Sequence, residues 1–248
     1  MKTIKFFSYS ILNDNLGSIK FDKKLIVNTI NPTCFSIAKK DKLYKDALIS
    51  SDILLPDGIG IVLAARLLFN KKIKRITGAD IHKYLLENAH NKNQRVFHLG
   101  ATNEVLKKIQ NRLDIEYPQI ISGSYSPPFR KEFSEAENNA MVKAVNSFKP
   151  NILFVGMTAP KQEKWVFRNK ELLDAKIIAS VGAVFDFYSG TVKRPGKFWR
   201  KIYLEGIIRT IRDPKRQWKK LFYYDLPFYA FIFSAFLSKK INQNLKSQ

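Results

Sequence analysis

The sequence predicts an α/β protein with a Rossmann-like, mostly parallel sheet, helices on both faces of that sheet, and a basic helical appendage at the C-terminus. Short apolar runs alternate with amphipathic segments as far as Gly190, and several runs end at glycine or proline. Repeated strand–turn–helix units of this length are typical of parallel sheets with right-handed crossovers. Acidic residues nearly vanish after Gly190. We therefore expect an α/β core over residues 1–190 and an appendage over residues 191–248.

The first half of the core alternates between strand and helix patterns. Apolar runs that end at proline-containing turns predict two strands, Lys24–Thr29 and Asp52–Leu55. Apolar residues three or four positions apart predict the helices between and after them: Thr33–Ser50 in two pieces, Ile59–Phe69 and Ala79–His90.

The second half of the core repeats the alternation. Its expected strands are Arg95–Leu99, Gln119–Ser122, Asn151–Val155 and Lys176–Val181. Its expected helices are Thr102–Tyr117, Glu132–Phe148 and Lys161–Lys170. Thr102 and Ser134 have hydroxyl side chains that suit an N-cap.

The composition narrows the class of protein. The 248 residues include 43 Lys or Arg and 21 Asp or Glu, which gives a formal charge of +22. Such a surplus favours an anionic partner: nucleic acid, a polyphosphate ligand or an anionic membrane. One cysteine and three scattered histidines give no disulfide framework and no zinc-ligand spacing. No signal peptide is apparent, so the expected location is the cytoplasm.

The appendage carries much of the surplus charge. Basic and apolar residues interleave between Thr191 and Lys220, and an aromatic segment follows from Phe222 to Phe236. A basic amphipathic helix followed by an aromatic one is typical of binding at a membrane surface. Packing on the core and nucleic-acid binding are the alternatives, and no RNA-binding aromatic pattern is visible. The segment Leu221–Leu237 is expected to be too short and too interrupted to span a bilayer.

Four turns follow expected strands and should meet at the carboxyl edge of the sheet, where open α/β sheets bind their ligands. They are Thr29–Asn31, Pro56–Gly60, Gly100–Asn103 and Gly156–Gln162. The sequence contains no G-x-G-x-x-G, Walker A, G-x-S-x-G or D-x-D motif. Dinucleotide, P-loop and serine-hydrolase chemistry therefore lack support, and we expect neither a cofactor nor a metal site.

Asp57 and Arg75 are the first candidates for chemistry. Asp57 stands on a turn between a buried strand and a helix, where a carboxylate can act as a general base. It could equally cap the following helix. Arg75 follows a basic loop, and its guanidinium could bind phosphate or sugar in a bidentate manner or simply lie at the surface.

Two further segments could bind a phosphorylated ligand. Gly156–Glu163 passes from a strand through small residues into a helix, which suits an anion at a helix N-terminus. Lys161 adds charge there, and an ordinary turn is the alternative. Phe185 and Asp186 could stack on a base and bind a ribose hydroxyl, although core packing of the ring is equally open.

These segments, taken in order, resemble the WecG/TagA/CpsF glycosyltransferase family, also called glycosyltransferase family 26. The similarity runs from about Thr29 to about Lys220. The matching motifs are Thr29-x-Asn31, Leu55-Pro56-Asp57-Gly58-x-Gly60, Arg75-x-x-Gly78-x-Asp80, Leu99-Gly100, Gly156-x-x-x-Pro160-Lys161-Gln162-Glu163-Lys164-Trp165, Gly182-Ala183-x-Phe185-Asp186, and Lys193-Arg194-Pro195 through Leu204-Glu205 and Arg209 to Pro214-x-Arg216.

The resemblance implies an inverting, metal-independent transfer of N-acetylmannosamine or another hexose from a UDP-sugar to a polyprenyl-diphosphate-linked sugar. The pathways concerned make teichoic acid or other bacterial surface polysaccharides. Asp57 is the implied base, with Arg75 and Gln162 at the reacting centre. The expected substrate-binding residues are Thr29, Asn31, Gly58, Gly100, Gly156, Pro160, Lys161, Glu163, Phe185 and Asp186. The arginines expected at the lipid diphosphate or the membrane are Arg194, Arg200, Arg209, Arg212 and Arg216.

Two other classes of function stay open on the sequence alone. One is a nucleotide-binding Rossmann enzyme that transfers no sugar, and the other is a basic protein that binds membrane or nucleic acid without catalysis. We expect a peripheral position on the inner face of the cell membrane and no nucleic-acid partner. A homo-oligomer is possible, and the sequence does not decide it.

Overall fold

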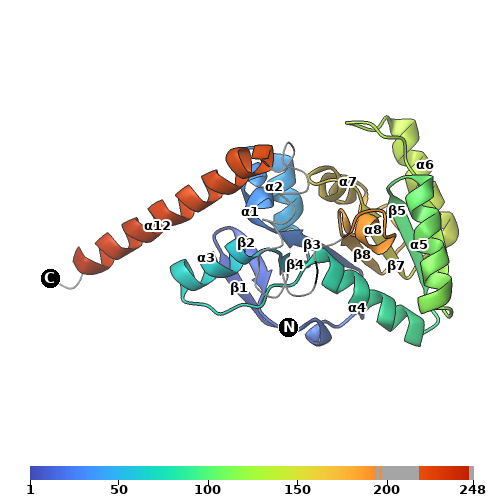
Figure 1. Ribbon diagram of the computed structural model, residues 1–248, viewed down its shortest axis with the longest axis horizontal. Coiled ribbons are helices and arrows are strands. Elements are labelled where there is room, and N and C mark those ends of the chain that lie inside the picture. The colour runs from blue at the N-terminus through green and yellow to red at the C-terminus, as the bar shows by residue number, and fades with distance from the viewer. Residues whose placement is uncertain (194–195, 197–217, 246–248) are drawn as a thin grey trace.

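A computed structural model describes residues 1–193, 196 and 218–245 of the chain (Figure 1). Its centre is a six-stranded parallel sheet in the order β4-β3-β8-β7-β5-β6. The strands are β3 (Leu25–Ile30), β4 (Ile53–Pro56), β5 (Arg95–Gly100), β6 (Ile121–Tyr125), β7 (Ile152–Gly156) and β8 (Ile177–Ser180). The predicted fold class, a mostly parallel α/β sheet, is confirmed.

Helices connect the strands and cover both faces of the sheet (Figure 1). They are α1 (Pro32–Ala38), α2 (Lys42–Ile49), α3 (Ile59–Phe69), α4 (Gly78–Asn91), α5 (Asn103–Glu116), α6 (Glu135–Phe148), α7 (Lys161–Asn169) and α8 (Val184–Tyr188). The predicted break of Thr33–Ser50 into two helices is confirmed. Thr102 and Ser134 are the N-caps of α5 and α6, as expected.

Alternation along the strands explains the layers. In β7, Ile152 and Phe154 pack into the core under α4, α5 and α8, whereas Leu153 and Val155 pack on the opposite face against α6 and α7. This period of two places successive side chains on opposite faces of a strand. Because both faces are buried, the strands are continuous apolar runs, the pattern that made them recognisable.

Four features differ from the sequence prediction. A hairpin of β1 (Thr3–Phe6) and β2 (Tyr9–Leu12) precedes the sheet and was not expected, and neither was the short helix α8. Strand β6 lies two residues later than predicted, because Ile121–Tyr125 is an edge strand with polar residues and glycine and lacks an apolar run. Helix α6 begins at Glu135 rather than Glu132, because Ser134 caps it.

The C-terminal part of the described chain is helical. A π-helical turn, η2 (Leu221–Asp225), leads into α12 (Leu226–Leu245), which projects from the core in Figure 1. The segment Trp218–Lys239 has 22 residues, and an 18-residue stretch of it has a mean hydropathy of 1.3, so by length and composition it could cross a membrane. The expectation that Leu221–Leu237 is too short was therefore wrong, because the helix continues from the π-helical turn through Pro227.

Helix α12 is held against the core at both ends of its apolar stretch. Thr33 Oγ1 donates to Asp225 Oδ1 at 2.7 Å, and Lys239 Nζ donates to the carbonyl oxygen of Leu68 at 2.6 Å. Between these contacts, Phe228 and Ile232 are buried in the cluster that α1, α3 and the hairpin share. The helix therefore lies along the α1 and α3 side of the molecule.

Candidate active site

Asp57 lies at the carboxyl end of β4, beside the end of β3. The two strands pair Thr29 with Leu55 and Ile30 with Pro56, and the Asp57 amide then donates to the Ile30 carbonyl oxygen at 2.9 Å. Asp57 is half-exposed. The N-cap of α3 is Gly58, which has no side chain to cap the helix. Asp57 therefore stands one residue before the N-cap position.

Gly58 allows the sharp turn that presents Asp57. Its φ is +91°, in the region that favours glycine, and a Cβ there would lie 3.5 Å from Pro32 Cδ and 3.6 Å from Asn31 Cβ. Asn31 is thus next to the Asp57 turn, and its Oδ1 accepts the Cys34 amide at 2.9 Å as the N-cap of α1. The side-chain oxygen of Asn31 is therefore used in capping α1.

Arg75 approaches the same turn from the segment before α4. The Ile76 amide donates to the Pro56 carbonyl oxygen at 2.9 Å. Arg75 precedes Ile76 and Asp57 follows Pro56, so this hydrogen bond brings the two backbone segments together. Its side chain is half-buried. The start of α4 is fixed by a capping box, in which Thr77 N and Oγ1 both donate to Asp80 Oδ2 at 2.8 Å. Asp80 is therefore part of the cap of α4.

Gly100 and Gly156 are paired at the ends of β5 and β7. Gly100 has φ +126°, and a Cβ on it would lie 2.5 Å from the Gly156 carbonyl oxygen. A Cβ on Gly156 would lie 2.3 Å from Phe185 Cδ2. Phe185 is 1% exposed and packs on the Gly156 backbone. The core-packing alternative therefore describes this ring, and it has no exposed face on which a base could stack.

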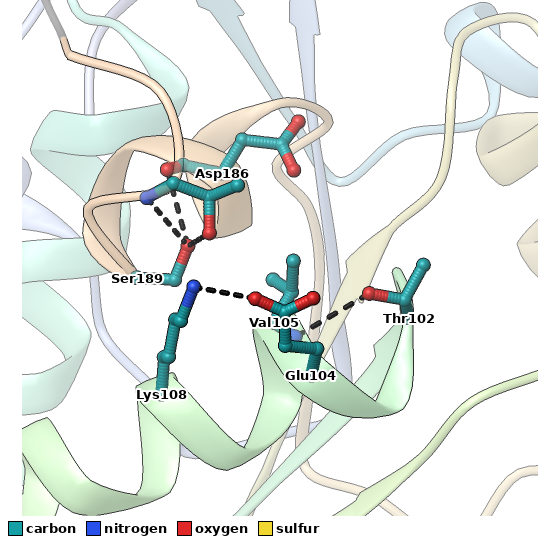
Figure 2. Close-up of polar contacts among 7 residues, drawn as sticks. Thr102, Glu104, Val105, Lys108, Asp186 and Ser189 are labelled. Carbon is teal, nitrogen blue, oxygen red and sulfur yellow. Dashed lines mark hydrogen bonds and ion pairs between the residues drawn. The ribbon is translucent and has the colours of Figure 1, made fainter.

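Asp186 lies one residue further along α8 and is half-exposed. Figure 2 shows its carboxylate directed away from Ser189. Thr102 caps the first turn of α5 at the Val105 amide, and Glu104 pairs with Lys108 Nζ at 2.6 Å (Figure 2). Of the predicted pair, Asp186 is thus the residue placed at an accessible position.

Gln162 is 3% exposed and links two strand ends. Its Oε1 accepts the Met157 amide at 3.1 Å and the Gly182 amide at 3.0 Å, and its Nε2 donates to Glu163 Oε1 at 2.8 Å. Glu163 is 1% exposed, and burial raises its pKa to about 7. Both side chains therefore lie in the interior, beneath the loop that starts α7.

Lys161 points toward the loop before α6. Its ammonium group donates to the Arg130 carbonyl oxygen and lies 3.7 Å from the centre of the Phe133 ring. Burial lowers the pKa of Lys161, and the Glu137 carboxylate partly opposes that shift. Pro160, before it, is the N-cap of α7 and follows a cis peptide bond.

Three helices at this edge begin at N-cap residues that have no capping side chain. These residues are Gly58 for α3, Pro160 for α7 and Ala183 for α8, whereas the N-cap side chains of α1, α2, α4, α5 and α6 accept a backbone amide. The first turn of a helix presents unpaired amides and a partial positive charge, which suits an anion. Uncapped starts at α3 and α7 leave that capacity beside Asp57 and Gly156.

Comparison with known proteins now decides the family. The model of the Glycosyl transferase WecG/TagA/CpsF family matches residues 7–242. The chain belongs to this family. It is therefore a glycosyltransferase, and the similarity noted from its motifs is confirmed.

Curated relatives of this glycosyltransferase share one name, N-acetylglucosaminyldiphosphoundecaprenol N-acetyl-beta-D-mannosaminyltransferase. The protein from Bacillus subtilis (strain 168) is 33% identical over 239 residues, covering 93% of this chain and 90% of the relative. The protein from Staphylococcus aureus (strain MW2) is 32% identical over 192 residues, and that from strain MRSA252 is 33% identical over 192 residues. Each of these two alignments covers 77% of this chain and 74% of the relative.

The glycosyltransferase core thus gathers most predicted site residues at one edge of its sheet. The ends of β3 and β4 are surrounded by Thr29, Asn31, Asp57, Gly58 and Arg75. The ends of β5, β7 and β8 are surrounded by Gly100, Gly156, Pro160, Gln162 and Gly182. Arg194, Arg200, Arg209, Arg212 and Arg216 lie outside the described residues. Among the residues described, no group of three or more His, Cys, Asp or Glu could hold a metal ion.

Tyr229 is a neighbour of the site that sequence reasoning missed. A Cβ on Gly60 would lie 2.9 Å from the Tyr229 hydroxyl oxygen and 2.6 Å from Pro32 Cγ. Helix α12 therefore reaches the first turn of α3, directly after Asp57. Tyr229 was recognised only as one of many aromatic residues in the appendage, because its spacing says nothing about which helix it touches.

Proposed function

We propose that this glycosyltransferase moves an N-acetylmannosamine-type sugar, or another hexose, from a UDP-sugar to a polyprenyl-diphosphate-linked acceptor sugar. The relatives' shared name describes N-acetylmannosaminyl transfer to N-acetylglucosaminyl-diphosphoundecaprenol, which supports the transferred sugar and the acceptor. The product would serve bacterial surface polysaccharide or teichoic acid synthesis.

Asp57 is the proposed general base. Its half-exposed carboxylate at the carboxyl edge of the sheet, beside the end of β3, is the observation that carries the proposal. Asp57 removes the proton from the acceptor hydroxyl as the oxygen attacks the anomeric carbon. The bond from that carbon to the UDP oxygen breaks, and its electron pair leaves with the diphosphate. Attack from the face opposite UDP inverts the anomeric configuration.

Stabilisation of the leaving diphosphate falls to helix N-termini and cations in this proposal. The uncapped starts of α3 and α7 offer backbone amides, and Arg75 offers a guanidinium at the same edge. Fixed donors and charges of this kind stabilise a developing anion without the help of a metal. Thr29, Asn31 and Asp186 would bind the sugar and ribose hydroxyls. Gln162, Glu163 and Phe185 would shape the site from beneath.

The proposed location is the inner face of the cell membrane, with the appendage and α12 at the lipid surface. The π-helical turn η2 exposes Phe222 and Tyr223, and α12 exposes Phe233; their exposed fractions are 56%, 67% and 62%. Aromatic residues with a basic neighbourhood favour the interface between headgroups and acyl chains. That position would bring Asp57 close to a lipid-borne acceptor.

The test is a transfer assay with a panel of UDP-sugars and a short-chain lipid-diphosphate N-acetylglucosamine acceptor. Wild-type protein should transfer one sugar with inverted configuration, read by NMR of the product, and should keep its rate in EDTA. Asp57→Asn should lower kcat by at least a hundredfold with little change in UDP affinity, because its amide cannot take a proton. Normal turnover by Asp57→Asn would refute the base, and loss of activity in EDTA would refute the metal-free step.

A further inference from the structure

Glu163 is a buried acid that the proposed reaction does not use directly. It lies on α7, is 1% exposed, and spends one carboxylate oxygen on Gln162 Nε2. Its other oxygen, Oε2, has no hydrogen-bond partner in the described chain. A buried carboxyl is costly to keep, so its presence here calls for a role.

The side chain of Gln162 has two ends with opposite requirements. Met157 and Gly182 both present N–H donors, so only a carbonyl oxygen can satisfy them, and Gln162 Oε1 accepts from both. If the amide were flipped, its NH₂ group would face these two donors. A carboxyl oxygen of Glu163 can accept only from that NH₂ group, so the contact at 2.8 Å selects the productive orientation.

The atoms joined by this amide lie at the centre of the sheet edge. Met157 follows β7 and Gly182 follows β8, and these two strands are neighbours. Gly182 has φ +60°, so a tight turn is held in place by its hydrogen bond to Gln162. The Gln162 side chain thereby fixes the loop before α7 relative to the turn before α8.

We propose that Glu163 is a positioning residue that locks the Gln162 amide in the orientation joining the loop after β7 to the turn after β8. The consequence for catalysis rests on the proposed function, because the loop after β7 carries the uncapped start of α7 that would meet the diphosphate. Cys34 on α1 and Tyr44 on α2 interact electrostatically with the carboxyl, and neither supplies a positive charge. The acid is therefore held for its acceptor oxygen and not for an ion pair.

The test compares two substitutions at this position. Glu163→Met keeps the length of the side chain and removes the acceptor, whereas Glu163→Gln keeps an acceptor oxygen. Hydrogen exchange followed by NMR should show the Met157 and Gly182 amides exchanging at least tenfold faster in Glu163→Met, and at close to the wild-type rate in Glu163→Gln. Glu171→Met, the same change at an exposed site just after α7, is the matched control and should not alter either amide.

Coupling to Gln162 completes the test. Gln162→Met should itself release both amides, and adding Glu163→Met to it should change their exchange by less than about twofold, because the second residue acts only through the first. In transfer assays, Glu163→Met should lower kcat at least tenfold, and Glu163→Gln should recover most of that loss. Equal protection of both amides in wild type and Glu163→Met would overturn the proposal.

Two outcomes are kept apart by this design. Hydrogen exchange needs neither donor nor acceptor, so it decides the positioning role even if wild-type protein transfers no sugar in the panel. Should Glu163→Met fail to fold, Glu163→Asp replaces it, because the shorter side chain withdraws the acceptor from Gln162 and keeps the carboxyl. Glu163→Asp should also speed exchange of the Gly182 amide at least tenfold, and wild-type protection in that variant would contradict the proposal.

Discussion

Three buried titratable residues set how the stability of this glycosyltransferase varies with pH. Burial raises the pKa of Glu163 from 4.5 to about 7 and lowers the pKa of His98 from 6.5 to about 3. Burial, helped by His98 and Arg112, also lowers the pKa of His82 well below its ordinary value. All three side chains are therefore favoured in their neutral forms by the fold.

The signs of these shifts predict that the joint contribution of the three residues is greatest near pH 7. Between about pH 3 and 7 the unfolded chain binds protons that folded His98 and His82 do not, so their contribution rises with pH. Between about pH 4.5 and 7 folded Glu163 retains a proton that the unfolded chain has lost, so its contribution falls with pH. Two histidines outweigh one acid up to about pH 7, where the two slopes cancel. Urea unfolding across pH 4 to 8.5 measures the curve.

The variant Glu163→Gln isolates the contribution of Glu163 to the pH dependence of the free energy of unfolding. Because an uncharged amide has no proton to lose, the variant should gain on the order of 3 kcal/mol relative to wild type between pH 4.5 and pH 8. The comparison is made on the difference between the two proteins, so effects of other titrating groups cancel. A difference that stays constant over this range would mean that Glu163 is ionised or exposed in the folded state.

At the scale of elements, close packing between strand ends and helices decides which side chains can face the site. Gly156→Ala would place a Cβ 2.3 Å from Phe185 Cδ2, and this ring cannot move outward because it is buried against His98 and His82. We expect a loss of about 1–3 kcal/mol in the free energy of unfolding, the usual result of overfilling a core.

A second substitution shows whether the clash is the cause. Phe185→Leu removes ring atoms next to Gly156 and so relieves the clash. The double variant should therefore lose at least about 1 kcal/mol less free energy of unfolding than the sum of the losses in the two single variants. Gly17→Ala is the control, since a Cβ there meets nothing within 4 Å. Additive losses in urea unfolding would show that the Phe185 ring does not limit residue 156.

The elements that sequence reasoning found are those with strong local patterns. Strands buried on both faces are apolar runs, and a capping residue before an amphipathic pattern marks the start of a helix in the sequence. Both kinds of element could therefore be predicted. The β1–β2 hairpin was missed, although Ile4, Phe6, Tyr9 and Ile11 are buried, because so short an alternation is a weak pattern. The burial of Phe185 depends on its approach to the end of β7, and no local pattern contains that information.

The same limit applies to the candidate site. Motifs placed Asp57, Arg75 and the Gly156–Glu163 segment at one sheet edge. In the structure β4 and β7 belong to one parallel sheet, so the turns that follow these strands lie at the same edge. Motifs could not show that Gln162 and Glu163 face inward, because their direction depends on hydrogen bonds to Met157 and Gly182. The contact of Tyr229 with the first turn of α3 likewise requires the docking of α12, which is remote in sequence.

At the scale of the whole molecule, the question is how α12 meets the membrane. A helix of 22 residues is about 33 Å long and could cross the hydrocarbon core. In this fold, however, Asp225 and Lys239 are both hydrogen-bonded to the core, at Thr33 and Leu68. Crossing the bilayer would require breaking one of these attachments, so we expect the helix to lie in the interface with its exposed side toward lipid.

This arrangement predicts how the protein leaves vesicles. The double variant Phe233→Asp with Leu237→Asp should bind anionic vesicles at least tenfold more weakly, because each exposed apolar side chain contributes about 1.5–3 kcal/mol when it enters the acyl region. Ile115→Asp is the matched control, since Ile115 is 81% exposed on α5, away from α12, and should bind as wild type does. Alkaline carbonate should release wild-type protein from vesicles if α12 lies in the interface. Retention in carbonate, with binding unaffected by the two aspartates, would instead mean that the helix crosses the bilayer and has given up its attachment to Thr33 or Leu68.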